Sequence, residues 1–246
     1  MRQILSVLLI LCAGTVAAAQ PDYGREKRWA DEITPALLVG DPVYLTQKSG
    51  HKFLTLHARN AKARAGVIVV HGLGVHPDWN LNNPLRSQLA EQGYATLSVQ
   101  MPVYAADADR ATYPTLFPDA AERLQVAVAF LREQGHRKIA IVSHSMGARM
   151  ANYFLVNTPQ PSVDAWIAVG LLGEYVQPAK LTSPILDIYG EKDFPDVLAL
   201  TSKRAAALRS IRGSGQIQVA GTDHFFNGAE AELVQHIRRF LDNATR

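Results

Sequence analysis

Cysteine is almost absent from this sequence: the 246 residues include a single one, Cys12. It lies in an amino-terminal segment that we expect to be removed, which would leave the mature chain without any thiol. Such a chain can form no disulfide, use no thiol nucleophile and build no cysteine-based metal site. A chain without cysteine is compatible with an oxidising compartment such as a bacterial periplasm.

An excess of charge of one sign is also missing. The chain has 25 Lys and Arg against 22 Asp and Glu, a formal net charge of +3, and no run rich in Lys or Arg. Proteins that bind nucleic acids through charge concentrate basic residues in a patch or stripe. We therefore expect no nucleic-acid partner.

No apolar run is long enough to cross a bilayer comfortably, which takes roughly 20 residues. The apolar stretch at residues 4–12 follows Arg2 and precedes three alanines at positions 17–19. A positive charge, a short apolar core and an Ala-x-Ala site are typical of a secretory signal peptide. We expect residues 1–19 to be cleaved after Ala19, giving a periplasmic or secreted protein that is not stably inserted in a membrane.

The remaining residues, 20–246, have an ordinary globular composition. Over the whole chain, 48% of residues are hydrophobic and 19% are charged, which is enough apolar material for a sizeable core. There is no internal repeat, low-complexity tract or linker. Since α/β folds of up to about 250 residues commonly form one domain, we expect a single domain over residues 20–246.

Apolar, β-branched runs alternate with helical patterns along this domain. Residues 42–47 and 52–58 look like two antiparallel strands joined by a turn at residues 49–50. The further predicted strands are residues 66–70, 94–99, 138–142, 165–169, 185–189 and 216–219; the predicted helices are 83–92, 119–134, 146 onward, 196–209 and 229–241. Asp119 and Glu122 have the spacing of a capping box. Alternating strands and helices favour a mostly parallel sheet with helices on both faces.

Two serines, Ser143 and Ser145, lie between a predicted strand and a predicted helix, where a nucleophile elbow would occur. Such a tight turn requires small residues two positions before and two positions after the nucleophile. Ser145 satisfies this with Ser143 and Gly147, whereas Ser143 would have Ile141 before it. The pattern therefore favours Ser145, with Ser143 replacing the usual first glycine. A plain strand–helix turn with a serine N-cap is the alternative.

An acid and a histidine follow in the order that this arrangement needs, Ser, Asp/Glu, His. Asp193 comes after the strand at residues 185–189, and His224 follows the strand at residues 216–219. Both would lie at the carboxyl edge of the sheet, where open α/β sheets bind their ligands. We expect Asp193 to orient His224, and His224 to take the proton of Ser145. The competing acids are Glu191, Asp187, Asp196 and Asp223. His236, on a helix face, is expected at the surface.

A glycine-rich turn, His71-Gly72-Leu73-Gly74, follows the strand at residues 66–70. Its glycines would let the backbone approach a ligand closely. We expect the backbone N–H groups of Leu73 and Met146 to form an oxyanion hole, the second of them at the start of a helix.

With these parts in order, the sequence resembles the α/β-hydrolase superfamily over nearly all of the mature chain. Within it, the stretches "HGLGVHPDW" and "YATLSVQMP" resemble a bacterial, periplasmic domain-of-unknown-function family. The superfamily implies a three-layer α/β-hydrolase fold with a mostly parallel sheet. It also implies a serine hydrolase, carboxylesterase- or thioesterase-like, with an acyl-enzyme intermediate and a small ester-like substrate. No cofactor and no metal are expected. The closer family implies no substrate.

Two segments decide how open the site is. Only fifteen residues, 170–184, join two predicted strands where many lipases insert a helical lid, so we expect little or no lid. The irregular residues 100–118 are either a plain loop or a flap over the site. Amide hydrolysis remains open within the enzyme class. A catalytically silent α/β-hydrolase-fold binding protein of the cell envelope is the alternative from another class.

Overall fold

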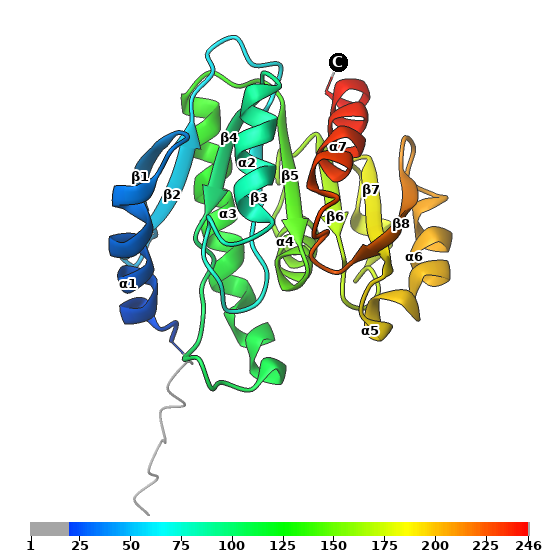
Figure 1. The fold of residues 1–246 in the computed structure, drawn as a ribbon, viewed down its shortest axis with the longest axis horizontal. Helices are drawn as coiled ribbons and strands as arrows, with labels where there is room; N and C mark the ends of the chain where they lie inside the picture. Colours follow the sequence, from blue (N-terminus) through cyan, green and yellow to red (C-terminus); the bar gives the residue numbers. More distant parts are fainter. Residues whose placement is uncertain (1–19, 246) are drawn as a thin grey trace, which may run out of the picture.

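The computed structural model describes residues 20–245, in which eight strands form one sheet between layers of helices (Figure 1). The predicted signal peptide, residues 1–19, lies outside the described residues. The strand order is β1-β2-β4-β3-β5-β6-β7-β8. The strands are β1 Asp41–Thr46, β2 Lys52–Ala58, β3 Gly66–Val70, β4 Ala95–Val99, β5 Ile139–His144, β6 Ala165–Val169, β7 Ile185–Lys192 and β8 Gly215–Asp223.

The sheet is mostly parallel, as predicted. β2 pairs antiparallel with β1 and with β4, and every other neighbouring pair is parallel. All five residues of β3, Gly66–Val70, are buried, because helices cover both faces of a parallel sheet and leave no room for a polar side. The continuous apolar run that predicted this strand follows from that burial.

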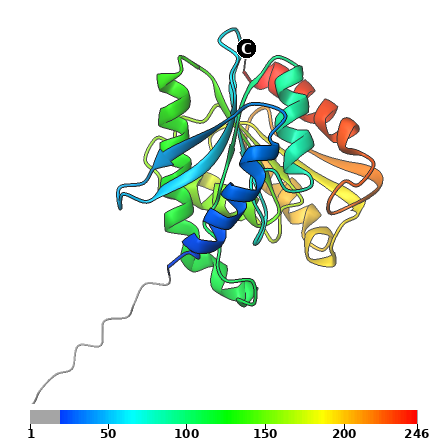
Figure 2. The same ribbon diagram turned by 60° about the vertical axis from the view of Figure 1, so that its left-hand side comes forward.

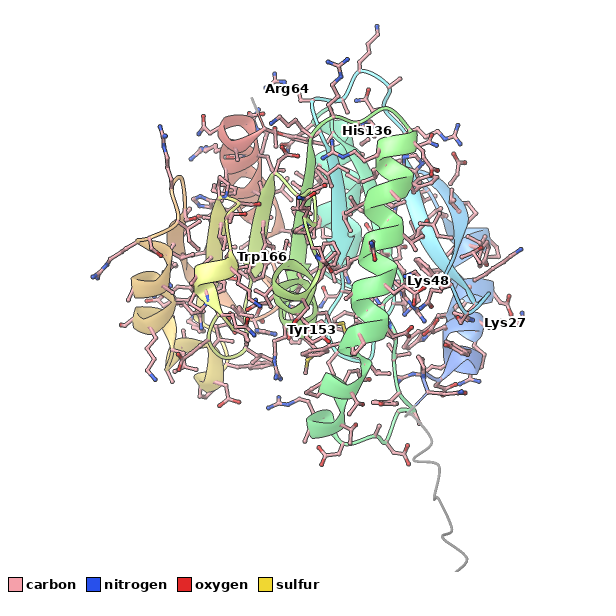
Figure 3. All side chains as sticks on the ribbon, turned by 180° about the vertical axis from the view of Figure 1, so that it is seen from behind. Lys27, Lys48, Arg64, His136, Tyr153 and Trp166 are labelled. Atoms are coloured by element: carbon pink, nitrogen blue, oxygen red, sulfur yellow. The ribbon has the colours of Figure 1, made fainter. Side chains whose placement is uncertain are left out.

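Helices cover both faces of the sheet. The helices are α1 Tyr23–Ile33, α2 Asn82–Glu91, α3 Phe117–Glu133, α4 Met146–Asn157, α5 Pro195–Leu198, α6 Thr201–Leu208 and α7 Glu230–Ala244, with short 3₁₀ helices η1 Thr34–Ala36, η2 Arg110–Leu116 and η3 Pro178–Lys180. One apolar cluster joins the sheet to α2 and α7. A second joins the opposite face to α3, α4 and α6, and Figure 3 shows α3 and α4 from that side. None of the helices between residues 20 and 245 is long and apolar enough to cross a membrane.

The first helix, α1, was not predicted. The Asp22 side chain caps it by accepting the N–H of Arg25 at 2.8 Å. Its few apolar residues, Ala30 and Ile33, pack with Leu54 and Leu56 of β2, and Figure 2 shows the helix beside that strand. Only these two residues connect the helix to the apolar core cluster of β2, so polar contacts must supply the rest of its attachment.

Two side chains of α1 make long-range polar contacts. Arg25 donates to the carbonyls of Gly74, at 3.0 Å, and Tyr104, at 2.8 Å. Glu26 is buried and accepts two hydrogen bonds from Arg123 of α3, at 2.9 and 3.1 Å. Burial raises the pKa of Glu26, and the charge of Arg123 opposes that rise. The helix thus ties together the loop after β3, the loop after β4 and α3.

The predicted capping box at the start of α3 is wrong. The helix begins at Phe117 and has no side-chain cap. The Asp119 carboxylate accepts a hydrogen bond from the Gln47 side chain, and Glu122 accepts the N–H of Lys48 at 2.5 Å. These acids bind the β1–β2 hairpin instead of their own helix terminus. The predicted helix 196–209 is also divided, into α5 and α6.

Candidate active site

Five neighbouring parallel strands end at one edge of the sheet, and each is followed by a residue of the candidate site. His71 follows β3, Ser145 follows β5 and Gly170 follows β6; Asp193 follows β7 and His224 follows β8. Parallel strands bring their carboxyl ends to the same edge. The topology therefore gathers residues that are far apart in the sequence.

Ser145, His224 and Asp193 form a hydrogen-bonded chain. His224 Nε2 lies 2.9 Å from Ser145 Oγ, and its Nδ1 lies 2.5 Å from Asp193 Oδ1. All three residues are buried. Because the carboxylate accepts the Nδ1 proton, Nε2 is left to accept the serine proton. The structure thus brings together the three residues selected from the sequence.

The turn at Ser145 has strained backbone geometry, with φ 57° and ψ −121°. A non-glycine residue in this region costs about 1–3 kcal/mol and persists only where its surroundings enforce it. Here the enforcing contact is close packing of α4 on the end of β3. A Cβ on Gly147 would lie 2.3 Å from the His71 carbonyl oxygen. Gly147 is therefore required by space, as the elbow pattern predicted.

Gly170 makes room for the histidine. Its φ is +57°, and a Cβ there would lie 2.9 Å from Cε1 of His224. The Asp193 carboxylate accepts the N–H of Phe194 at 2.7 Å and, more weakly, that of Gly190 at 3.3 Å. The glycine thus leaves space for the His224 ring, and neighbouring backbone N–H groups hold the Asp193 carboxylate.

Each competing acid has another role. Glu191 accepts the N–H of Gly221 at 2.7 Å, and Asp223 accepts the N–H of Phe225 at 2.9 Å.

Asp187 is fully buried in an ion pair with Arg204, at 2.9 Å, and burial raises its pKa. Asp196 lies 3.5 Å from Arg110 on the surface, and His236 lies 3.7 Å from Glu232 along α7. Asp193 is the acid that pairs with His224.

The two expected oxyanion donors lie next to Ser145. Leu73 lines the same pocket as Ser145, and Met146 is the first residue of α4. Within residues 20–245, neither backbone N–H donates a hydrogen bond to another group. The start of α4 also presents the positive end of its dipole to this point.

His71 fixes one of these donors, a role that the sequence did not indicate. Burial lowers its pKa to about 3, so the ring is neutral. Its Nε2 accepts the N–H of Met101 at 2.8 Å; its Nδ1 therefore carries the proton and donates to the Gly72 carbonyl at 2.9 Å. That carbonyl and the Leu73 N–H belong to one planar trans peptide and point in opposite directions. Holding the carbonyl therefore sets the direction of the N–H.

His144 holds the loop that carries His224. It is buried, and burial lowers its pKa to about 3. Its Nε2 donates to the backbone carbonyl of His224 at 2.9 Å. The residue directly before Ser145 therefore holds the loop that carries His224, a role that no sequence pattern indicated.

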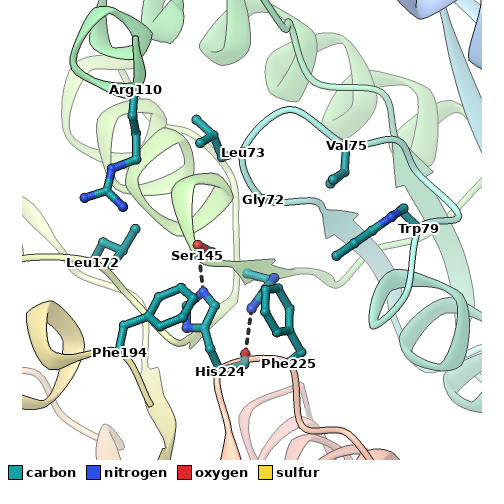
Figure 4. A pocket seen from close by; sticks show the side chains of 11 residues that line it. Gly72, Leu73, Val75, Trp79, Arg110, Ser145, Leu172, Phe194, His224 and Phe225 are labelled. Atoms are coloured by element: carbon teal, nitrogen blue, oxygen red, sulfur yellow. Dashed lines mark hydrogen bonds between the residues drawn. The ribbon is translucent and has the colours of Figure 1, made fainter. Parts of the chain in front are cut away.

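A mostly apolar pocket of about 200 Å³ opens above Ser145. Phe194 stacks on His224 with ring centroids 4.1 Å apart, and Trp79 meets Phe225 edge-on at 5.8 Å. The pocket is lined by Gly72, Leu73, Val75, Trp79, Arg110, His144, Ser145, Leu172, Phe194, His224 and Phe225 (Figure 4). Phe194 and Phe225 each follow a residue of the hydrogen-bonded chain, which is the one sequence signal that could have revealed them.

The segment 100–118 does not fold over the pocket with its apolar side chains. Met101, Val103, Tyr113 and Leu116 are buried in the protein core. From this segment, Arg110 reaches the pocket. The connection at residues 170–184 contains η3 as its only helix, so it carries no helical lid, as predicted. Across residues 20–245, no three His, Cys, Asp or Glu side chains are grouped as a metal site.

The comparisons with known proteins identify the family of this chain. The model of the alpha/beta hydrolase family matches residues 67–245. The chain belongs to this family. A second model, described as a protein of unknown function (DUF3530), matches residues 3–121, the part that contains both stretches that indicated a domain-of-unknown-function family. No curated protein matches this α/β hydrolase.

Solved structures share the fold at low sequence identity. A dienelactone hydrolase from Anabaena variabilis is 20% identical with a TM-score of 0.70, over 83% of this chain and 97% of that one. An esterase from Pyrococcus furiosus is 14% identical with a TM-score of 0.66, over 84% and 91%. An alpha-beta serine hydrolase homologue from Coxiella burnetii is 17% identical with a TM-score of 0.65, over 83% and 99%. The α/β-hydrolase fold is confirmed.

Proposed function

We propose that this α/β hydrolase is a serine hydrolase that cleaves small esters or thioesters. The observation that carries the proposal is the hydrogen-bonded chain from Ser145 through His224 to Asp193. The esterase and the dienelactone hydrolase among the similar structures support the same class of reaction. The pocket above Ser145 is of a size for a small substrate.

In the proposed acylation step, Ser145 Oγ attacks the ester carbonyl while its proton moves to His224 Nε2. Asp193 keeps the imidazole oriented and stabilises its positive charge. His224 then gives the proton to the departing alcohol or thiol, which leaves an acyl group on Ser145. In deacylation, water loses a proton to His224 and attacks the acyl carbonyl; as the acid leaves, His224 returns the proton to Ser145 Oγ.

The negative oxygen that forms in both steps would lie against the N–H groups of Leu73 and Met146. Donors directed at such an oxygen before the reaction need no rearrangement during it, and removing one typically costs about 10²–10³ in kcat. The hydrogen bond from His71 to the Gly72 carbonyl supports the proposed direction of the Leu73 donor.

A fluorophosphonate probe tests the proposal, because it labels a serine only when that serine is activated as a nucleophile. We expect one label on the wild type, on Ser145, and none on Ser145→Ala with an unchanged melting temperature. Hydrolysis of a p-nitrophenyl ester should fall by on the order of 10⁶ in kcat in that variant. A folded wild type that takes no label would favour the silent binding protein of the cell envelope.

We also propose that the protein is exported and acts in the periplasm or outside the cell. Arg2, the apolar residues 4–12 and the alanines at 17–19 support this. The intact mass of protein recovered from a periplasmic fraction should correspond to a chain beginning at Gln20; a retained Met1 would contradict it.

A further inference from the structure

The apolar pocket above Ser145 contains one permanently charged side chain. Of the pocket-lining residues, all drawn from the described part of the chain, only Arg110 is a Lys, Arg, Asp or Glu. Figure 4 shows its guanidinium beside Leu172, on the side of the pocket opposite Trp79. A neutral ester needs no such group, because an apolar pocket and an oxyanion hole suffice to bind it.

Among residues 20–245, the one ion-pair partner of the Arg110 guanidinium does not occupy it. Asp196 Oδ2 lies 3.5 Å from Nη2, and the two side chains are 56% and 71% exposed. Exposed pairs at such a distance contribute little, because water competes for both partners. A guanidinium has five N–H donors in a planar fork. Arg110 therefore retains donors for a ligand that enters the pocket.

A second arginine lies on the continuation of this pocket. A neighbouring surface groove shares Arg110 and Leu172 with the pocket and is also lined by Arg149 of α4. Arg149 lies over the Phe117 ring at 5.5 Å, and no carboxylate within residues 20–245 pairs with it. Burial lowers the pKa of Arg149, and the positive charge of Arg110 lowers it further. The groove is thus lined by two guanidinium groups.

The acids of this groove do not neutralise that pair. Glu174 pairs with Lys203 at 2.9 Å, and Asp196 makes only the exposed contact with Arg110. An anion bound at Arg110 would also be attracted by the positive charge of Arg149, which lines the same groove. A carboxylate matches the planar fork of arginine with two parallel hydrogen bonds.

We infer that the substrate is an ester that carries a second, ionised carboxylate, which Arg110 binds while Ser145 attacks the ester carbonyl. Arg149, in the groove beyond Leu172, adds to the electrostatic attraction of this carboxylate. The inference rests on the proposed function, because it names the class of ester that the same site accepts. Arg110 is a specificity-determining residue here and takes no part in the proton transfers.

Matched pairs of esters test the inference. The substrates are the monomethyl esters of succinate, glutarate and adipate, each with one carboxylate, and the neutral dimethyl esters of the same acids. Hydrolysis is followed by proton release at constant pH. We expect at least one monoester to exceed its diester in kcat/KM per ester group, by tenfold or more at low salt. The preference should decrease in 0.5 M NaCl, because salt screens a partly exposed pair.

Three variants isolate the role of Arg110. Arg110→Met should lower the monoester-to-diester ratio at least tenfold, and Arg110→Lys should retain part of it. Arg212→Met, which removes an exposed arginine outside both the pocket and the groove, should leave both rates unchanged. A wild type that prefers the diesters, or a ratio unchanged in Arg110→Met, overturns the inference. A merely structural role for Arg110 would lower both rates equally and is therefore also such an outcome.

A binding measurement separates failure of this inference from failure of the proposed function. If the wild type takes no fluorophosphonate label and cleaves neither ester, the hydrolase proposal fails. Calorimetric titration with glutarate then tests the anion site alone. Binding that weakens at least tenfold in Arg110→Met, but not in Arg212→Met, supports the site; no binding of glutarate to the wild type at millimolar concentration overturns it.

Discussion

The indole N–H of Trp166 donates a hydrogen bond to Oγ of Ser143, 2.8 Å away, and both side chains are fully buried. Ser143 Oγ in turn donates to the Ile167 carbonyl at 3.2 Å. The hydroxyl that replaces the first glycine of the elbow thus connects β5 with β6. Figure 3 shows Trp166 on the face covered by α3 and α4. This contact gives Ser143 a structural role distinct from that of Ser145.

Replacing Ser143 by Gly should leave kcat/KM within about tenfold, because the position only needs a small residue. The free energy of unfolding should fall by about 1–3 kcal/mol, since the buried indole N–H of Trp166 loses its acceptor. Urea denaturation measures this loss. In a Trp166→Phe background the same substitution should cost less. A Ser143→Gly variant as inactive as Ser145→Ala would show that the elbow is assigned to the wrong serine.

Replacing Asp193 by Asn should lower kcat by about 10³–10⁴ without unfolding the protein, because His224 would be held in the wrong tautomer. Glu191→Gln is the matched control, two residues away. It removes a charge that touches only the Gly221 N–H and should change kcat little. The two variants are compared by ester hydrolysis and by melting temperature. The opposite order of effects would move the acid to Glu191.

Replacing His71 by Phe should lower kcat by up to about 10²–10³ while KM changes much less, because the Leu73 donor loses its fixed direction and acts mainly on the transition state. The control is His57→Phe, the same change at another buried histidine, on β2 and not among the pocket-lining residues. Steady-state kinetics separate kcat from KM. Equal losses of kcat in both variants would mean that the hydrogen bond to Gly72 is not the cause.

His57 should make the protein less stable in acid. Neither ring nitrogen has a hydrogen-bond partner in the described part of the chain, and burial, then the charge of Arg59, lower its pKa to about 4. The unfolded chain binds this proton below about pH 6.5 and the folded chain does not. Stability is therefore complete above pH 6.5 and is lost as the pH falls toward 4.

The same pair of proteins tests this pH dependence. Between pH 7 and pH 5, the wild type should lose about 1–2 kcal/mol of unfolding free energy relative to His57→Phe. Urea denaturation at several pH values measures the difference. A difference that stays constant over this range would mean that His57 is protonated in the folded state as readily as in the unfolded one.

Neutral esters with long acyl chains should be poor substrates, and interfacial activation should be absent. The pocket of about 200 Å³ is smaller than the roughly 300–1,000 Å³ of sites for drug-sized ligands, and each buried CH₂ contributes about 0.8 kcal/mol only where there is room for it. In a p-nitrophenyl series from acetate to palmitate, activity should level off or fall after a few carbons. Activity that climbs toward palmitate would require an acyl tunnel.

The strands and the hydrogen-bonded chain could be predicted because their signals are local. The run Gly66–Val70 is apolar throughout because both faces are covered. The elbow required a small residue at 147, and the close approach to the His71 carbonyl gives the reason. Asp193 and His224 followed from the positions at which their strands end. Each of these inferences needed only a few consecutive residues and the topology of the fold.

The features that were missed depend on partners far along the chain. The polar helix α1 has little apolar periodicity, and its Glu26 meets Arg123, 97 residues later. Asp119 and Glu122 have the spacing of a capping box, but they accept hydrogen bonds from the hairpin residues Gln47 and Lys48 instead. Arg110 reaches the pocket only because η2 turns it there. No local pattern contains this information.

The polar contacts of α1 also have a consequence for the order in which the protein assembles. Arg25 binds the carbonyls of Gly74 and Tyr104, 49 and 79 residues further on, and Glu26 binds Arg123. A ribosome delivers the chain from its amino end. The first described helix is therefore made before the groups that hold it, and it docks only after they have emerged. The first helix of the described chain to be made is therefore one that completes the tertiary structure late.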